Sequence, residues 1–410
     1  MKIIISFLFF FSVLLAQPKQ VSVGADVLLS SKLELIDGKN IAVVTNHSAI
    51  LNSGEHLIDA LVNIPTIKIV ALFGPEHGIR GNASAGEHVI NSIDEITGVP
   101  IFSLYGETKK PTKEMLTNVE ILIFDMQDVG ARYYTYLSTM ILTMEAAAEN
   151  KIPIIILDRP NPIRGTKIDG PIRLDSLKSF VAWLAVPIIH GMTFGEIAKM
   201  ANEKNWLANG LKADLKIIEI EGWRRALWFD EMNLKWTAPS PNIKTLNSAI
   251  IYPGTCLMEG TNISEGRGTE NPFEIIGAPW LDSKKLISDL YQSNLLGVKF
   301  KEMNFTPQSI ANIAPNPKYK NEICSGIFIE VTNRNIFEPI KTEIAILISI
   351  YKNHPDKFEF KEKGFDRLAG TPIIRQEILK GKNLTQICLR WKSEVDKFAK
   401  ERKKYLIYND

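Results

Sequence analysis

Short apolar runs alternate with helical patterns along the first two thirds of the chain. The apolar runs predict buried strands at residues 41–44, 67–73, 100–104, 121–124, 154–157 and 215–220. Helical patterns lie between them, at about residues 25–35, 55–62, 137–150 and 193–206. This alternation is typical of an α/β protein, and it predicts a doubly wound parallel sheet domain over residues 20–280.

The remainder of the chain, residues 281–410, has a different pattern. Residues 298–305 and 326–331 alternate like antiparallel strands, residues 342–351 are helical, and charged helices follow to the end. We expect a second, smaller α+β domain that packs against the sheet domain. Its boundary is defined to no better than about ten residues, because element ends are the least predictable feature of a sequence.

The N-terminus has the pattern of a secretory signal peptide at residues 1–16. Lys2 precedes an apolar stretch that ends near Leu15, and Ala16 offers a small residue at the cleavage point. The stretch is short for a membrane span. Leu14 is larger than a cleavage site usually has, so an uncleaved anchor is the alternative. We expect an exported protein, periplasmic or secreted, without stable membrane association.

Composition excludes several classes of function. The 410 residues carry a formal net charge of +2 and no long basic block, which argues against nucleic-acid binding. Three cysteines without CxxC or HExxH spacing do not make a disulfide scaffold or a structural zinc site. The turn after the first strand, residues 45–49, has no glycine, so a dinucleotide site is rejected. P-loop and GxSxG motifs are also absent. We therefore expect no cofactor and no metal.

Polar clusters follow four of the predicted strands. The carboxyl ends of parallel strands meet at one edge of a sheet, where ligands bind in open α/β folds. We therefore expect these side chains to converge on one crevice, although simple turn and helix-capping roles are the alternative. The clusters are Asn46 with His47, Glu76 with His77, Asp125 with Gln127 and Asp128, and Asp158 with Arg159 and Asn161.

Two further groups of residues have the composition of a binding site. Arg132 and the tyrosines at 133, 134 and 136 follow the fourth strand. Glycines at 254, 260, 266 and 268 predict a shaped loop, the kind of element that often carries function, although a solvated surface loop is the alternative. This loop and the segment before it present Asn242, Glu259, Asn262, Glu265 and Arg267.

These segments resemble the exo-β-N-acetylmuramidases of the NamZ type, glycoside hydrolase family 171. The resemblance runs from about residue 22 to the C-terminus and rests on six ordered motifs, at residues 46–47, 74–78, 125–136, 158–162, 190–193 and 259–269. It implies a Rossmann-like domain, a smaller C-terminal domain and an active site in the cleft between them. It also implies release of N-acetylmuramic acid from the non-reducing ends of peptidoglycan fragments, with Glu76 as the catalytic glutamate.

Glycoside cleavage needs a group that protonates the leaving oxygen and a second group that stabilises the transition state. Glu76 follows an apolar strand, where partial burial would raise its pKa and make it a general acid. We expect His77 to be its hydrogen-bond partner. The second group stays open, because an acetamido sugar can also supply its own nucleophile. The candidates are Asp125, Asp128, Glu259, Glu265, Tyr134 and Tyr136.

N-acetylmuramic acid differs from N-acetylglucosamine by a lactyl carboxylate, which an arginine can bind with two hydrogen bonds. Arg132 and Arg267 are the first candidates for this role, with Arg80 and Arg159 in reserve. Other expected substrate contacts are Asn46, Gln127, Asp128, Tyr136, Asn161, His190, Asn242, Glu259 and Asn262.

Two other classes of function remain open. A metal-dependent hydrolase would use oxygen and imidazole ligands, although no ligand spacing marks such a site. A non-catalytic periplasmic sugar-binding protein would use the same two-domain cleft without turnover. The candidate metal ligands are Asp125, Asp128, Asp158, His47, His77 and His190.

Overall fold

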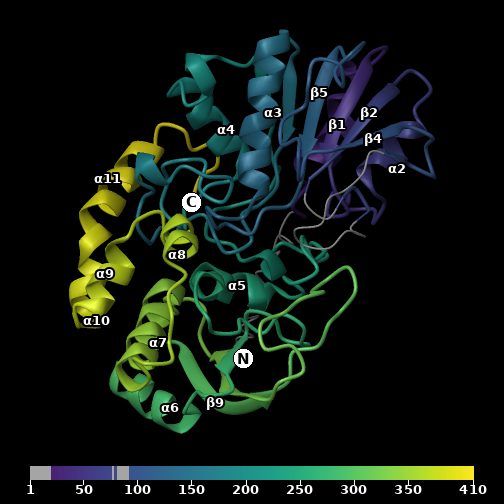
Figure 1. The fold of residues 1–410 in the computed structure, drawn as a ribbon. Coiled ribbons are helices and arrows are strands. Elements are labelled where there is room, and N and C mark those ends of the chain that lie inside the picture. The colour runs from purple at the N-terminus through teal and green to yellow at the C-terminus, as the bar shows by residue number, and fades with distance from the viewer. Residues whose placement is uncertain (1–19, 76–77, 81–91) are drawn as a thin grey trace, which may run out of the picture.

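The computed structural model describes residues 20–75, 78–80 and 92–410. In this part of the chain, seven strands form the sheet of the first domain, in the order β3-β4-β2-β1-β5-β6-β7 (Figure 1). All neighbouring strands are parallel except β3 and β4. The strands are β1 (Asn40–Thr45), β2 (Lys68–Gly74), β3 (Ser92–Ile93), β4 (Pro100–Ser103), β5 (Ile121–Asp125), β6 (Ile154–Leu157) and β7 (Leu215–Ile218).

The strand order reverses between β1 and β5. From β1 the chain moves outward to β2 and β4, and then returns to β5 on the other side of β1 before continuing to β6 and β7. This is the doubly wound arrangement in which ligands bind beyond the carboxyl ends of the strands. The predicted Rossmann-like fold class is confirmed.

Alternate residues of the central strands enter two different hydrophobic clusters. Ala42 and Val44 of β1 pack with α3 (Tyr136–Asn150) and α4 (Phe194–Glu203), whereas Ile41 and Val43 pack with α1 (Gly24–Ser31) and α2 (Leu57–Val62). Apolar residues on both faces of a strand require helices on both faces of the sheet. The predicted helix over residues 25–35 ends earlier, at Ser31, and a short 3₁₀ turn follows.

The second domain contains a three-stranded antiparallel sheet in the order β8-β10-β9, within the described residues. Its strands are β8 (Ile275–Ala278), β9 (Val298–Phe305) and β10 (Cys324–Val331), and the helices α5 (Leu246–Thr255), α6 (Ser283–Gln292) and α7 (Pro339–Asn353) accompany them. This confirms the predicted smaller α+β domain, although β8 precedes the expected boundary at residue 280. Cys256, Cys324 and Cys388 are free thiols.

The C-terminal helices run from the second domain back to the sheet domain (Figure 1). The last residues bind there: the Tyr408 hydroxyl donates a hydrogen bond to Asp158 at 2.6 Å, and Arg402 donates to the main-chain oxygens of Gly165 and Gly191. The chain end therefore ties the domains together. The helices are α8 (Glu362–Ala369), α9 (Ile373–Leu379), α10 (Leu384–Cys388) and α11 (Lys392–Arg402). Among the described helices, we find none with the length and apolar character needed to span a bilayer.

Candidate active site

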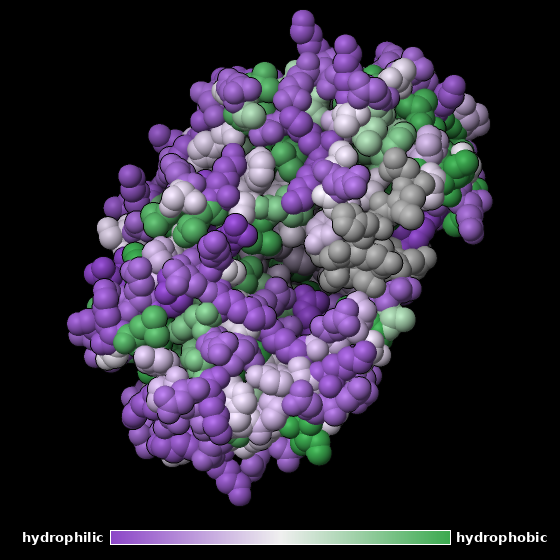
Figure 2. Space-filling model, viewed as in Figure 1, coloured by the Kyte–Doolittle hydropathy of each residue, from purple (hydrophilic) through white to green (hydrophobic). Residues whose placement is uncertain are grey.

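A cavity of about 180 Å³ lies where the two domains meet, and we call it the interdomain cavity. Figure 2 shows that the surface is hollowed between the domains. One wall comes from the loop between β5 and α3, and the other from α5, the 3₁₀ helix η5 (Cys256–Gly260) and the loop after it. Its lining includes Tyr105, Tyr133, Tyr134, Tyr136, Ser240, Tyr252, Cys256, Glu259, Arg267 and Phe273.

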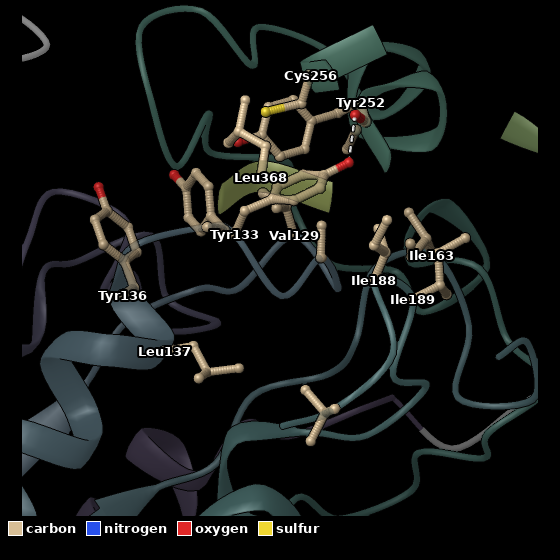
Figure 3. Packing of buried hydrophobic residues seen from close by; sticks show 14 of the residues in the cluster. Val129, Tyr133, Tyr136, Leu137, Ile163, Ile188, Ile189, Tyr252, Cys256 and Leu368 are labelled. Atoms are coloured by element: carbon tan, nitrogen blue, oxygen red, sulfur yellow. Dashed lines mark hydrogen bonds between the residues drawn. The ribbon is translucent and has the colours of Figure 1, made fainter. Parts of the chain in front are cut away.

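Aromatic rings make up much of this lining. The Tyr134 ring centroid lies 4.6 Å from that of Tyr136 and 6.1 Å from that of Tyr252, both edge to face. The Tyr136 hydroxyl donates to the oxygen of Pro239 at 2.8 Å, and the Tyr133 hydroxyl donates to main-chain oxygens of α5 (Figure 3). Edge-to-face packing and these hydrogen bonds fix the rings. The result is a rigid aromatic wall.

Charged side chains adjoin the aromatic rings, and the Arg267 guanidinium lies over Phe273, 5.1 Å from its ring centroid. Arg267 Nη2 donates to Glu259 Oε1 at 2.7 Å, and Arg267 Nε lies 3.5 Å from Glu265 Oε1. Burial would lower the pKa of Arg267, but the two carboxylates hold it above its ordinary value. Glu259 and Arg267 reach the cavity, whereas Glu265 is buried behind them.

Arg267 is flanked by two glycines whose backbone has the left-handed conformation. Gly266 has φ +78° and Gly268 has φ +81°, a conformation that residues with a side chain rarely adopt. A Cβ at Gly268 would lie 2.4 Å from the main-chain oxygen of Gln308. The second half of the predicted glycine loop is therefore a shaped loop that presents a guanidinium.

The first half of that loop prediction was wrong, because residues 254–260 are helical. Gly254 lies inside α5, and Gly260 ends η5. A Cβ at Gly254 would lie 2.3 Å from the oxygen of Pro339, so this glycine allows α5 and α7 to pack closely. A single sequence does not separate a glycine needed for helix packing from one needed for a turn.

Asp125 and Arg159 form a buried ion pair at the end of β5. Arg159 Nη2 donates to Asp125 Oδ2 at 2.9 Å, and Arg159 Nη1 donates to the oxygen of Ile50 at 3.0 Å. Both side chains are buried. Arg159 also lines a second cavity, of about 360 Å³, together with Gln127 and Ser48.

Asp128 and His190 are paired beneath the β5–α3 loop, with 3.5 Å between Asp128 Oδ2 and His190 Nε2. His190 Nδ1 accepts a hydrogen bond from the Met192 N–H, so Nε2 carries the proton of the neutral ring. Burial raises the pKa of Asp128 to about 7 and lowers that of His190 to about 3. Both side chains lie in the interior, outside the lining of the interdomain cavity.

Arg132 is fully buried and binds main chain. Its Nη1 donates to the oxygens of Pro171 and Val186, at 2.7 and 2.9 Å, and its Nη2 donates to the oxygen of Leu368 at 2.9 Å. Burial lowers its pKa to about 9. Leu368 belongs to α8, so this arginine links the sheet domain to the C-terminal helices.

Most of the predicted amides stabilise turns. Asn46 Oδ1 accepts from the Ser48 N–H and hydroxyl, and Asn161 Nδ2 donates to the oxygen of Met192. Asn262 and Asn242 donate to the main-chain oxygens of Lys357 and Ile313, respectively. Gln127 Nε2 donates to the oxygens of Asp128 and Pro160. These contacts shape the loops around the site.

Comparison with known proteins decides the family. The model of the N-terminal part of exo-β-N-acetylmuramidase NamZ matches residues 41–247, and the model of its C-terminal part matches residues 250–408. The chain belongs to the NamZ family. It is 45% identical over 394 residues to the peptidoglycan β-N-acetylmuramidase NamZ of Bacillus subtilis (strain 168), a match that covers 96% of this chain and 92% of that protein.

Two crystal structures of DUF1343 family proteins from Bacteroides fragilis NCTC 9343 have the same fold. One superposes with a TM-score of 0.87 at 32% identity, and the other with 0.78 at 36% identity. Each match covers 95% of this chain and 99% of the other protein. The NamZ models divide this chain just after residue 247, near the start of α5 and upstream of the boundary expected at residue 280.

Four of the residues predicted from the NamZ motifs lie together on the interdomain cavity: Tyr134, Tyr136, Glu259 and Arg267. Glu265 lies directly behind them. Glu76 and His77 lie outside the described residues. Arg80 forms ion pairs with Asp59 and Asp94.

The described residues at or beside the interdomain cavity include several that the sequence patterns did not mark. Tyr252 and Phe273 complete the aromatic wall, and Lys318 forms an ion pair with Glu265 at 2.9 Å. Tyr252 lies in an apolar helix and Lys318 in a segment without a motif, so no local signal marks either. Among the described residues, no group of three or more His, Cys, Asp or Glu side chains is arranged to hold a metal ion.

Proposed function

We propose that this NamZ-family protein is an exo-acting glycoside hydrolase that releases N-acetylmuramic acid from the non-reducing ends of peptidoglycan fragments, in peptidoglycan turnover. The observation that carries this proposal is the match to the Bacillus subtilis peptidoglycan β-N-acetylmuramidase, 45% identical across 96% of this chain. The interdomain cavity supports it, because aromatic and charged groups from both domains meet there.

Glu76 is the proposed general acid. In the sequence it follows Gly74, the last residue of β2, by two positions. The Leu104 N–H donates to the oxygen of Gly74 at 2.8 Å, and Tyr105, the next residue after Leu104, lines the interdomain cavity. The described end of β2 is therefore adjacent to the cavity wall, which supports a catalytic role for the residues that follow it.

The second catalytic group comes from the candidates that reach the cavity. Tyr134, Tyr136 and Glu259 line it. Asp125 is paired with Arg159, Asp128 is buried with His190, and the buried Glu265 is paired with Lys318. A buried and paired carboxylate is not available to an oxocarbenium-like centre. We therefore assign the second role to Tyr134, Tyr136 or Glu259, with the acetamido group of the sugar as the remaining route.

Arg267 is the proposed partner of the lactyl carboxylate. It reaches the cavity, and among the described residues its Nη1 makes no hydrogen bond, so this nitrogen is available to a ligand. Arg132 is fully buried, and its Nη1 and Nη2 donate to main-chain oxygens of the interior. The geometry thus favours Arg267 over Arg132 as the residue that distinguishes muramic acid from glucosamine.

One assay tests the function. The purified protein is incubated with a chromogenic N-acetylmuramide and with the corresponding N-acetylglucosaminide, each with and without EDTA. We expect release from the muramide only, unchanged by EDTA. Binding of the muramide without release supports a sugar-binding protein instead, and loss of release in EDTA supports a metal-dependent hydrolase.

We also propose that the protein is exported and acts in the periplasm or the medium. Lys2, the apolar stretch that follows it and Ala16 support this, because together they form the pattern of a cleaved signal peptide.

A further inference from the structure

Lys318 lies in the segment between β9 and β10, behind the charged wall of the interdomain cavity. Its ammonium donates to the main-chain oxygens of Met258 and Ile263, at 2.7 and 2.8 Å, and forms an ion pair with Glu265 Oε2 at 2.9 Å. An ammonium has three N–H bonds, and two of them are directed at these main-chain oxygens, while the ion pair with Glu265 adds a third contact. The side chain therefore has one defined position.

The segment that carries Lys318 lies against the loop that carries Arg267. The Gln308 N–H donates to the oxygen of Gly268 at 2.8 Å. A Cβ at Gly268 would lie 2.8 Å from Pro317 Cγ, so the residue next to Lys318 also touches this loop. Lys318 is therefore held next to the loop that carries Arg267.

Charged groups surround the buried Glu265 carboxylate. Lys318 lies on one side and Arg267 on the other. Among the described residues, Glu259, the Cys256 thiol of η5 and the Tyr252 phenol also interact with this cluster. Burial raises the pKa of the Cys256 thiol well above its ordinary value, so it is neutral. Burial alone would also raise the pKa of Glu265, but Lys318 and Arg267 together hold it below its ordinary value.

We propose that Lys318 is a positioning residue, which holds Glu265 in place and through it orients Arg267 and Glu259 on the cavity wall. The inference rests on the proposed function, because the oriented groups are those that would contact the sugar. Without Lys318, the buried Glu265 has only Arg267 as a cationic partner among the described residues. It must then either take up a proton or draw Arg267 away from Glu259, and both changes alter the wall.

The experiment measures the pH dependence of kcat/KM on the chromogenic N-acetylmuramide for Lys318→Met. We expect at least about a tenfold loss at neutral pH, the scale of one charge-assisted hydrogen bond. We also expect a change in the acid limb of the pH profile, which is the fall in kcat/KM toward low pH. It should move to higher pH by about one to three units, because loss of a neighbouring cation raises a carboxyl pKa by that amount. Glu265 then loses its charge, and the enzyme its activity, as the pH falls through the raised pKa.

Three variants complete the test. Lys318→Arg keeps the charge and should return the acid limb to its original position. Lys320→Met removes an exposed cation two residues away and should change neither activity nor the limb. Glu265→Gln is neutral at every pH, so it should lose activity across the whole range, and its result does not depend on whether Lys318→Met folds.

A folded Lys318→Met with an unmoved acid limb overturns the inference, and so does a fully active Glu265→Gln. In the double variant, adding Lys318→Met to Glu265→Gln should not shift the acid limb further, because the effect of Lys318 on this limb passes through the Glu265 carboxylate. An additional shift of the limb argues against the inference. If the unaltered protein releases nothing from the muramide, then the proposed function itself has failed, and this is distinguishable from normal turnover with an unmoved limb.

Discussion

Replacing Arg267 by Met should remove most of the preference for muramide over glucosaminide substrates. The guanidinium uses Nε and Nη2 on Glu259, which leaves Nη1 and the second N–H of Nη2 for a carboxylate. A hydrogen bond to a charged group contributes about 1.5 to 3 kcal/mol, which is roughly a ten- to hundredfold change in kcat/KM. Because two carboxylates already neutralise this arginine, we expect a value near the lower limit.

Arg132→Met should act on stability instead. It leaves three main-chain oxygens in the interior without their donor, and each such group costs about 1 to 3 kcal/mol. Part of this cost is offset, because a buried cation is removed. We expect a loss of about 3 kcal/mol in the free energy of unfolding, with an unchanged substrate ratio in the protein that remains folded.

The assay compares kcat/KM on the paired chromogenic substrates and measures urea unfolding for each variant. Arg390→Met, which removes an exposed arginine of the C-terminal helices, is the matched control. Arg267→Lys keeps the charge but not the planar guanidinium, so its preference for the muramide should lie between those of Arg267→Met and the unaltered protein. The reasoning is refuted if Arg267→Met keeps the full preference for the muramide, or if folded Arg132→Met loses it.

Three further outcomes are expected. Glu76→Gln should lower kcat by at least about a hundredfold without changing the thermal midpoint, as loss of a general acid does; an effect of a few-fold on turnover would move the acid role to another carboxylate, Glu259 first. Asp128 has its pKa raised to about 7 by burial, so the native state binds more protons than the unfolded state between about pH 4 and 7. Its contribution to stability is present below this range and is lost as the pH rises through 7, so Asp128→Asn should flatten the urea midpoint plotted against pH; an equally steep plot contradicts the assignment. Intact mass of protein recovered from the periplasm or medium should correspond to a chain that begins at Gln17, and a chain that still begins at Met1 contradicts export with cleavage.

The strand ends could be predicted from the sequence because their signals are local. An apolar run such as Ile121–Asp125 forms a strand buried on both faces, and the parallel rule then brings the polar residues after each strand to one edge. The same rule does not say which of these side chains reach a cavity. Asp125 and Arg159 follow different strands and neutralise each other, so two predicted site residues become a structural pair.

The roles of the arginines depend on contacts that no local pattern contains. Arg132 is separated by 236 residues from Leu368, whose oxygen it binds, and this contact places it in the interior. Arg267 is held by Glu259, eight residues away, between two glycines that only a turn explains. The environment of Arg267 is partly visible in the sequence, whereas that of Arg132 exists only when the C-terminal helices are in place.

The interdomain cavity requires both domains, and this constrains how the protein can work. Tyr134 and Tyr136 come from the sheet domain, whereas Glu259 and Arg267 come from the second domain. Side chains that must act together have to be held within a fraction of an ångström, so two domains that moved freely would destroy the site. The buried Arg132, the pairing of Tyr408 with Asp158 and the contacts of Arg402 with Gly165 and Gly191 connect the C-terminal segment to the sheet domain. We therefore infer a structural role for the C-terminal helices: they hold the two walls of the cavity in fixed positions relative to each other.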